Sequence, residues 1–253
     1  LFNFSVQTFK AAQGRKLSSM ECHDLMCFIG QIVVVGGVRR SAMISLSNLS
    51  DDRMRHAKSG QWWETAPHRA LANNSVSYTE KPDIETFMRE WTALVESKSG
   101  ERGIFNREAS KKQAKKYGRR DPNYEFGTNP CSEIILRPYQ FCNLTEVVVR
   151  ATDTLNDLKR KVKVATILGT IQSSYTRFPY LRKVWQKNTE EERLLGVSLT
   201  GIMDNPLMTA VNSKLEKTLD DLRNVALATN HEYADLLGIP QSAAITCVKP
   251  SGT

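Results

Sequence analysis

The sequence predicts an α/β protein whose strands run parallel. Short apolar runs alternate with amphipathic stretches along the chain. Several of the amphipathic stretches begin with a helix-capping residue, and some are followed by glycine. A chain of 253 residues with 40% hydrophobic content can build one large core or two modest ones. Strands joined by helices favour a parallel sheet, with functional groups near the carboxyl ends of the strands.

Helices are predicted where apolar residues recur with helical spacing. The stretch 18–35 offers Ser18 or Ser19 as a cap and places Glu21 in the first turn. Other helices are expected over 51–55, 84–95, 155–175 and 215–233, the last closed by Gly238 and Pro240. In the helix over 155–175, the side chains expected to face inward are those of Leu158, Val162, Ala165 and Leu168.

The helix over 84–95 has the clearest amphipathic pattern. Asp83 is suited to cap its start, and Gly100 stands just past its end. Its apolar stripe consists of Ile84, Phe87, Met88, Trp91, Leu94 and Val95. We expect this stripe to belong to the core and not to a cofactor site.

Strands are predicted in the short apolar runs between these helices. They are expected over 43–46, 76–78, 103–106, 134–136, 147–149, 194–200 and 243–248. The polar segments 71–75 and 111–120 are expected to be loops. No run reaches the roughly 20 apolar residues that a membrane-spanning helix needs.

The net charge of +8 comes from 35 basic and 27 acidic residues. A basic excess often indicates nucleic-acid binding, but no nucleic-acid-binding motif accompanies it here, so nucleic acid is not an expected partner. Much of the excess lies in the segment 111–120, which we expect to be solvated. A polyphosphate substrate and effector would also suit a positive field.

The chain has five cysteines, without the paired spacing of a zinc site, so we expect no metal site. Without a secretory signal, we expect a reducing, cytoplasmic location and no structural disulfides. Cys22, Cys27 and Cys247 are expected to be packing residues. His23 is expected to be a helix-surface or satisfied core residue, because no second ligand stands one turn away.

The segment 129–133, Asn-Pro-Cys-Ser-Glu, is the main candidate for chemistry. It places an amide, a thiol and a carboxylate within five residues, and Cys142 follows eleven residues after Cys131. Pro130 fixes one backbone torsion and disfavours helix before it, so the segment is predicted to be a rigid loop. By residue type alone, two ordinary buried cysteines and a loop carboxylate explain the same pattern.

Three further segments could bind anions or bases. Their candidate residues are Gly37, Arg39 and Arg40 in the first, Arg69, Asn73 and Asn74 in the second, and Ser251, Gly252 and Thr253 in the third. Guanidinium forks match phosphate geometry, and glycine lets backbone N–H groups approach a phosphate. Each segment also has a plain alternative: a helix end beside solvated arginines, a tight turn, or a simple turn at the third.

Taken in order, these segments resemble the large subunit of ribonucleotide reductase. The matching stretches are 36–42 (Gly-Gly-Val-Arg-Arg-Ser-Ala), 71–75 (Leu-Ala-Asn-Asn-Ser), 99–107 (Ser-Gly-Glu-Arg-Gly-Ile-Phe-Asn-Arg), 129–133 with Cys142, 201–204 (Gly-Ile-Met-Asp) and 249–253 (Lys-Pro-Ser-Gly-Thr). One short motif would be weak evidence, whereas six in the expected order are strong. They most resemble the adenosylcobalamin-dependent (class II) branch, of the kind that reduces ribonucleoside triphosphates.

The resemblance implies a more specific fold and a role for each segment. It implies part of a ten-stranded α/β barrel with a central finger loop, incomplete at both ends. All of 1–253 would belong to this barrel, with the effector-specificity loops in 1–128 and the finger loop and substrate-phosphate part in 129–253. Gly37, Arg39 and Arg40 would lie in the first specificity loop, and Arg69, Asn73 and Asn74 in the second.

For the chemistry, the resemblance implies that Cys131 carries a thiyl radical and that Glu133 is the general base on the ribose 3′-hydroxyl. Asn129 would orient the ribose, and Cys142 would be one of two cysteines oxidised to a disulfide. Neither Cys22 nor Cys27 stands in a matching context, so its partner is expected upstream of Leu1. The C-terminal cysteine pair of the family is absent from 1–253.

The resemblance also implies partners. Ser251, Gly252 and Thr253 would bind the substrate phosphates. The expected partners are a ribonucleotide substrate, a deoxynucleotide effector, a thioredoxin-like reductant and the remaining segments of the same enzyme, with adenosylcobalamin as cofactor and no membrane. The resemblance further implies that the effector controls the enzyme allosterically and that the enzyme supplies deoxyribonucleotides for DNA replication.

Leu1 is not a natural start and Thr253 falls inside the last motif, so we expect a fragment, with an intein or split-gene boundary as one hypothesis. Three alternatives remain open. The chain could come from a class I large subunit that uses a separate radical-generating subunit. It could be a non-catalytic nucleotide-binding module. Basic nucleic-acid binding is the third, and salt-dependent affinity for DNA without nucleotide preference would reveal it.

Overall fold

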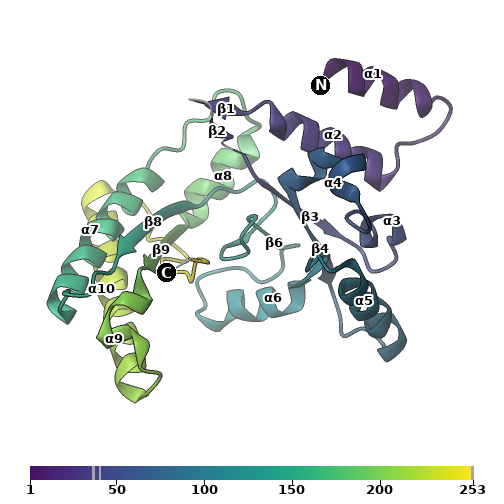
Figure 1. Ribbon diagram of the computed structural model, residues 1–253. Helices are drawn as coiled ribbons and strands as arrows, with labels where there is room; N and C mark the ends of the chain where they lie inside the picture. The colour runs from purple at the N-terminus through teal and green to yellow at the C-terminus, as the bar shows by residue number, and fades with distance from the viewer. Residues whose placement is uncertain (36–37, 40, 252–253) are drawn as a thin grey trace. The chain divides into compact units, whose positions relative to one another are not determined.

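The computed structural model describes residues 1–35, 38–39 and 41–251 (Figure 1). Contacts divide the chain into two compact units, Leu1–Ser110 and Lys111–Thr253. Helix α6 (Arg107–Lys116) crosses this boundary. Each unit has its own sheet and its own cluster of buried apolar residues. The functional division expected after residue 128 stays a prediction.

The first unit is built on a three-stranded parallel sheet of order β3-β4-β5. The strands are β3 (Met43–Ser47), β4 (Ala72–Tyr78) and β5 (Gly103–Asn106). Ahead of them come α1 (Phe2–Ala11), α2 (Ser19–Gln31) and the antiparallel pair β1 (Val34–Val35) and β2 (Val38–Arg39). The crossovers contain α3 (Asp52–Arg55), α4 (Trp62–Thr65), η1 (Pro67–Leu71) and α5 (Ile84–Ser97).

The second unit contains a short hairpin and a parallel strand pair. The hairpin joins β6 (Gly127–Thr128) to β7 (Ile135–Leu136), and the parallel pair is β8 (Asn143–Val148) with β9 (Leu195–Thr200). The helical elements are α7 (Leu155–Ser173), α8 (Lys183–Glu192), η2 (Ile202–Asp204), α9 (Pro206–Thr209) and α10 (Ser213–Leu237). Helices α7 and α10 lie side by side, and α7 packs on both strands of the pair (Figure 1). These parallel strands and helical crossovers confirm the predicted α/β class.

Capping residues set the helix starts as the sequence indicates. Ser18 and Glu21 form a capping box at the start of α2, and Thr154 and Asp157 form another at the start of α7. The predicted end of the first helix at residue 35 is wrong, because α2 ends at Gln31 and the next residues pair as β1. The end of α10 at Gly238 is confirmed, with that glycine at φ 64°.

The core of the second unit lies between α7, α10 and the strand pair. Leu158, Val162 and Ala165 are buried there, as predicted. Leu168 is not, since it is 58% exposed. Gly169 beside it is buried instead, and an added Cβ there would lie 3.1 Å from the Leu195 side chain. The apolar pattern missed it because glycine has no apolar side chain.

The predicted burial of the α5 stripe is wrong for four of its six residues. Ile84, Met88, Trp91 and Val95 are exposed, Phe87 and Leu94 are half-buried, and Glu90 is the buried residue of this helix. Its carboxylate contacts Arg55 Nε at 2.5 Å and Arg102 Nη2 at 2.6 Å. Burial alone favours the neutral acid, but the two arginines hold the pKa of Glu90 below its ordinary value. Glu90 therefore lies on the inward face of α5, together with Phe87 and Leu94, which stand three and four residues away from it.

The two loops predicted over 71–75 and 111–120 are wrong in part. Residues 72–75 belong to β4, because they pair in parallel with β3, and from Ser75 onward β4 also pairs with β5. In the basic segment, residues up to Lys116 are helical in α6. Asn106 Oδ1 accepts a hydrogen bond from Ala109 N at 2.9 Å and so caps this helix. Helix-compatible lysines and alanines then continue it, whatever their charge.

Two smaller expectations are also corrected. The segment 243–248 forms no regular strand, although it runs parallel to β9 through the bridge Val197↔Thr246. Leu195 N donates to Ala244 O at 2.9 Å, and Val197 N donates to Ile245 O at 2.8 Å. Cys27 is buried as expected, whereas Cys22 is exposed on α2. None of the described helices is long and apolar enough to cross a membrane.

Replacing Leu158 by alanine tests the assignment of the core. Leu158 is fully buried, so we expect Leu158→Ala to lower the free energy of unfolding by about 3 kcal/mol through lost burial and a residual cavity. Leu168→Ala, one of the exposed positions on the same helix, should change it by less than about 0.5 kcal/mol. Urea unfolding followed by circular dichroism measures both. Equal losses would contradict this assignment of the inward face of α7.

Candidate active site

The segment predicted to be a rigid loop connects the two strands of the β6–β7 hairpin. Asn129 closes this loop, since its Oδ1 accepts a hydrogen bond from Ile134 N at 3.1 Å. Ser132 N donates to Asn129 O at 2.9 Å, and Ser132 adopts the left-handed conformation with φ 63°. The turn therefore depends on the Asn129 side chain. Because its Oδ1 is used within the loop, its NH₂ group is the part of this side chain that can bind a ligand.

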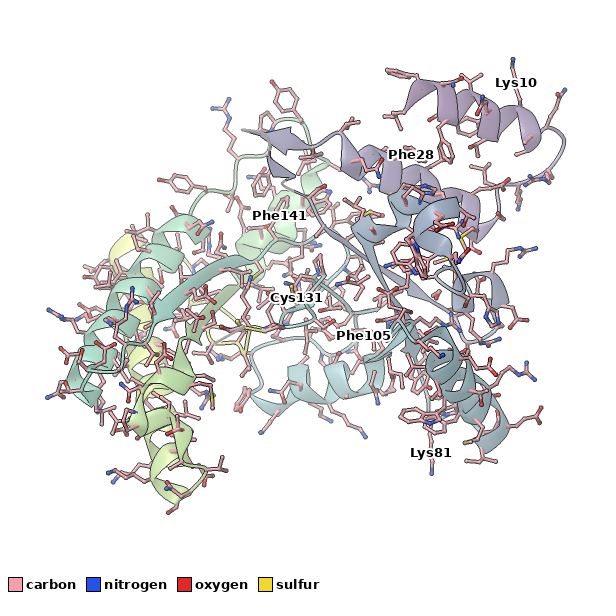
Figure 2. The ribbon with its side chains drawn as sticks, viewed as in Figure 1. Lys10, Phe28, Lys81, Phe105, Cys131 and Phe141 are labelled. Atoms are coloured by element: carbon pink, nitrogen blue, oxygen red, sulfur yellow. The ribbon has the colours of Figure 1, made fainter. Side chains whose placement is uncertain are left out.

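Cys131 and Glu133 have opposite environments on this loop. Cys131, labelled in Figure 2, is exposed, whereas the Glu133 side chain has no exposed surface. Neither oxygen of Glu133 accepts a hydrogen bond within the described residues. Lys249 Nζ lies 3.8 Å from Glu133 Oε1, which is an ion pair without a good hydrogen bond. A buried carboxylate with unused acceptors is suited to take a proton from a bound hydroxyl group.

Glu133 also lines a cavity of about 210 Å³ in the second unit. Tyr117, Arg119 and Arg223 contribute to other parts of its wall. Arg223 stacks over the Tyr117 ring at 4.8 Å, and Arg119 donates to Ser242 O at 3.0 Å. The carboxylate is therefore not sealed in an apolar core, and the cavity beside it carries positive charge.

Cys142 stands immediately before β8 and is partly buried. Burial raises the pKa of its thiol to about 12, and Cys247 and Glu133 act in the same direction. Burial, with Glu133 nearby, also raises the pKa of the Cys247 thiol to about 11. Both groups remain thiols at neutral pH. Because Glu133 contributes to both shifts, the carboxylate and the two sulfurs share one electrostatic neighbourhood.

The base of the hairpin packs closely on β9 at Gly196. A Cβ built there would lie 2.4 Å from Leu144 Cδ2, 2.9 Å from Ile134 Cδ1 and 3.1 Å from Cys247 Sγ. Glycine leaves room for these three side chains as they stand, and a Cβ would force at least the ends of Leu144 and Ile134 to move. Gly196 therefore lets the residue after Glu133 and the sulfur of Cys247 meet over the strand.

The hairpin is also fixed from below by the buried carboxylate of Glu192, at the end of α8. Arg120 donates to it from Nε at 3.0 Å and from Nη2 at 2.8 Å. Arg137 Nη2 lies 2.9 Å from Oε1, and Gln140 Nε2 donates to Oε2 at 2.6 Å. Thus side chains from the segment before β6 and from the segment after β7 bind the same carboxylate.

Of the predicted phosphate-binding residues, Ser251 is described, and Gly252 and Thr253 lie outside the described residues. Ser251 is exposed, and its hydroxyl forms a short hydrogen bond with the Thr200 hydroxyl at the end of β9. This contact places Ser251 at the carboxyl end of a parallel strand. That position agrees with where the α/β pattern predicts functional groups.

The predicted effector residues lie in the first unit. Arg69 binds both oxygens of Asp24 at 2.7 Å and donates to Ala57 O at 2.8 Å. Asn74 is 2% exposed, and its Oδ1 lies 3.0 Å from His23 Nε2. These two side chains therefore hold the unit together, whereas Asn73 is exposed on β4.

The first predicted specificity loop is described only in part. Arg39 belongs to β2, and Gly37 and Arg40 lie outside the described residues. His23 is buried and makes contacts through both ring nitrogens, which confirms the expectation of a satisfied core histidine.

Curated relatives match the chain over nearly its whole length. A protein of Lacticaseibacillus paracasei named adenosylcobalamin-dependent ribonucleoside-triphosphate reductase is 32% identical, covering 96% of this chain and 35% of that protein. A protein of the same name from Levilactobacillus brevis is 28% identical, with 98% and 36% covered. This chain is a homologue of part of these reductases. It spans about a third of their length.

The fold comparison agrees with this result. The crystal structure of a B-12 dependent (class II) ribonucleotide reductase superposes with a TM-score of 0.68 at 22% identity, covering 94% of this chain and 36% of that one. No family model matches the chain. The shared fold and the relatives confirm the resemblance to class II reductases that the six motifs indicate.

Three features of the site were missed by sequence reasoning. Lys249 is part of a matching motif, but nothing in its spacing connects it with Glu133. Cys247 is predicted only to pack, although its sulfur reaches the hairpin base. Glu192 stands in an ordinary polar helix sequence, 190–193. The sequence feature that comes closest to indicating Glu192 is the pair Arg120 and Arg137. These arginines flank the loop and, once buried, need an acidic partner.

The thiols should differ in reactivity. We expect iodoacetamide at about pH 8 to modify Cys131 and Cys22 before Cys142, whose thiolate fraction at a pKa of about 12 is only about 10⁻⁴. Time-resolved mass spectrometry of tryptic peptides measures each rate. Cys22 serves as the exposed reference on another unit. Faster labelling of Cys142 than of Cys22 would contradict the assigned environments.

Protonation of His23 should affect stability. Burial by itself lowers its pKa, but hydrogen bonds to Asp24, Cys27 and Asn74 outweigh this and raise the pKa from 6.5 to about 9. The stabilisation is therefore complete below about pH 6.5 and is lost as the pH rises through about 9. We expect the free energy of unfolding to fall over that range.

Urea unfolding at several pH values measures this fall. His23→Gln should remove most of it, because glutamine does not titrate. His56→Gln is the matched control, since His56 lies on the surface of the same unit. Identical pH profiles for the wild type and His23→Gln would contradict the assigned role.

Proposed function

We propose that this chain forms the catalytic centre of a ribonucleotide reductase that converts ribonucleoside triphosphates to 2′-deoxyribonucleotides. It acts together with the remaining segments of the same enzyme. The observation that carries this proposal is the presence, on one tight hairpin loop, of an exposed thiol at Cys131 and a buried carboxylate at Glu133 whose oxygens accept no hydrogen bond within the described residues. The relatives, which are named for this reaction, support it.

Cys131 begins the chemistry as a thiyl radical that removes the hydrogen atom from C3′ of the ribose. This step needs a sulfur that a substrate can reach, and Cys131 is exposed. Glu133 takes the proton of the 3′-hydroxyl, for which its unused acceptors are suited. The 2′-hydroxyl then leaves as water. Asn129, whose Oδ1 closes the loop, offers its amide NH₂ to orient the sugar.

Two thiols supply the electrons and protons for each turnover. They are oxidised to one disulfide, while the nucleotide loses its 2′-oxygen as water and gains hydrogen at C2′. Cys131 finally returns the hydrogen atom to C3′, and Glu133 returns the proton to the 3′-oxygen. Cys142 is one of the two reducing thiols, and its raised pKa keeps its proton available at neutral pH. Its partner cysteine comes from the remaining segments of the same enzyme, and a thioredoxin-like protein restores both thiols.

The exposed position of Cys131 fits a radical source that approaches the hairpin from outside. Adenosylcobalamin, when bound, supplies the radical through homolysis of its cobalt–carbon bond. The names of the relatives and of the solved structure support this cofactor. For this chain, the role is to present the Cys131 sulfur on a loop that is closed by hydrogen bonds.

The other predicted residues complete the proposal. Ser251, Gly252 and Thr253 bind the substrate phosphates, and Ser251 lies at the end of β9, where its hydroxyl contacts that of Thr200. A deoxynucleotide effector binds in the first unit through Gly37, Arg39, Arg40 and Asn73, while Arg69 and Asn74 support it from within. The parallel sheets of the two units belong to a ten-stranded barrel around the finger loop, and the enzyme is cytoplasmic.

Two substitutions in the complete enzyme test this function. We expect Cys131→Ser to abolish deoxynucleotide formation and Glu133→Gln to lower kcat by about 10²- to 10⁴-fold, because the general base is lost. Product is measured by chromatography with a ribonucleoside triphosphate, adenosylcobalamin and a dithiol.

Cys22→Ser is the control and should keep the wild-type rate, since Cys22 is exposed on α2 in the first unit. Unchanged product formation by Cys131→Ser would rule out the radical role. Stopped-flow spectroscopy of cofactor homolysis separates this reductase class from one with a separate radical-generating subunit.

A further inference from the structure

Glu192 is a charged group buried among the stems of the hairpin. It is 2% exposed, and its two oxygens are contacted by the side-chain nitrogens of Arg120, Arg137 and Gln140. Four donor atoms at 2.6 to 3.0 Å use the acceptor positions of the carboxylate fully. Balancing the charge of Glu192 would need only one nearby cation, whereas these directed contacts also fix the positions of all three partner side chains.

The three partners come from both sides of the active loop. Arg120 precedes β6, whereas Arg137 and Gln140 follow β7. Arg120 also donates to Ile135 O at 3.0 Å, which ties the first stem directly to the second. The carboxylate therefore sets the separation of the two stems from which the loop 129–134 projects.

Helix α8 adds a second attachment to the same stem. Asn188 Nδ2 donates to Pro138 O at 2.8 Å and to Tyr139 O at 3.2 Å. Trp185 packs on Phe141 with ring centroids 4.7 Å apart, and Figure 2 shows Phe141 beside this helix. Thus one face of α8 holds the residues 137–141 that lead from the hairpin to Cys142.

A two-residue strand pair cannot hold such a loop by itself. The hairpin has two paired positions, Gly127↔Leu136 and Thr128↔Ile135. Isolated hairpins are marginal in water even when they are longer. The two stems therefore need contacts from outside the hairpin to hold their positions. Glu192 is buried and contacts both of them.

We propose that Glu192 is a positioning residue for the reductase reaction. It fixes the two hairpin stems, and so it sets where the Cys131 sulfur and the Glu133 carboxylate stand relative to Cys142. Glu192 does not touch the substrate. The inference rests on the proposed function, because it assigns a task to the geometry of that same loop.

The decisive comparison uses the complete enzyme with Glu192→Gln and Glu190→Gln. Glu190 lies on the same helix but contacts Thr176 and Gln186, away from the hairpin stems. We expect Glu192→Gln to lower kcat by about 10²-fold, as small misplacements of reacting groups do, with a much smaller change in KM. Glu190→Gln should keep the wild-type kcat.

The double variant Glu192→Gln with Arg120→Gln separates positioning from charge balance. The single change leaves the buried Arg120 guanidinium without its acidic partner, whereas Arg137 keeps Glu191 at 2.8 Å, and it should lower the unfolding temperature. The double change removes the unpaired guanidinium, so the unfolding temperature should recover, but kcat should not, because no carboxylate bridges the stems. Recovery of kcat in the double variant would overturn the proposal, as would an unchanged kcat in Glu192→Gln.

Two further measurements keep the result interpretable. If Glu192→Gln does not fold, Arg137→Lys replaces it, since lysine keeps the charge but not the guanidinium fork, and the same loss of kcat is expected. Alkylation of Cys131 relative to Cys22 should change several-fold in the variant, independently of turnover. A reductase that keeps its activity with Cys131→Ser would contradict the proposed function itself, whereas an inactive Cys131→Ser beside a fully active Glu192→Gln would contradict only the positioning role.

Discussion

A carboxylate buried between two guanidinium groups holds each unit of this protein together. Glu90 pairs with Arg55 and Arg102 in the first unit, and Glu192 pairs with Arg120 and Arg137 in the second. Buried charge is tolerated only where every partner is in place, so these clusters admit one arrangement of the segments that meet there. In the first unit this decides which face of α5 is turned inward. In the second it decides how the hairpin stems are spaced.

The loop on those stems separates two chemical tasks over three residues. The thiol at 131 is exposed, where a substrate can meet it, and the carboxylate at 133 is buried, where few donors compete for its oxygens. The left-handed turn at Ser132 lies between them. A radical step and a proton transfer on neighbouring ribose positions need such a division, because one group must be accessible and the other must keep its acceptors unused until substrate binds.

The sequence was informative where local rules decide the structure. Capping at Ser18, the strand over 195–200 and the end of α10 at Gly238 depend on neighbours in the chain, and these were predicted correctly. Errors arose where distant partners decide the structure. Glu90 is buried in α5 because it pairs with arginines from other segments, and residues 72–75 belong to β4 because they pair with β3. At the site, motifs identified Cys131, Glu133 and Cys142. Composition could not reveal Glu192 or the approach of Cys247, since both depend on packing across more than 50 residues of chain.

The absence of a side chain at Gly196 has a consequence for comparing distant relatives. The strand, the hairpin base and the Cys247 sulfur converge on a space that a single methyl group would fill. A methyl group there would force the side-chain ends of Leu144 and Ile134 into other positions. A relative without this glycine therefore has to pack the hairpin base on the strand differently, even when its cysteines remain.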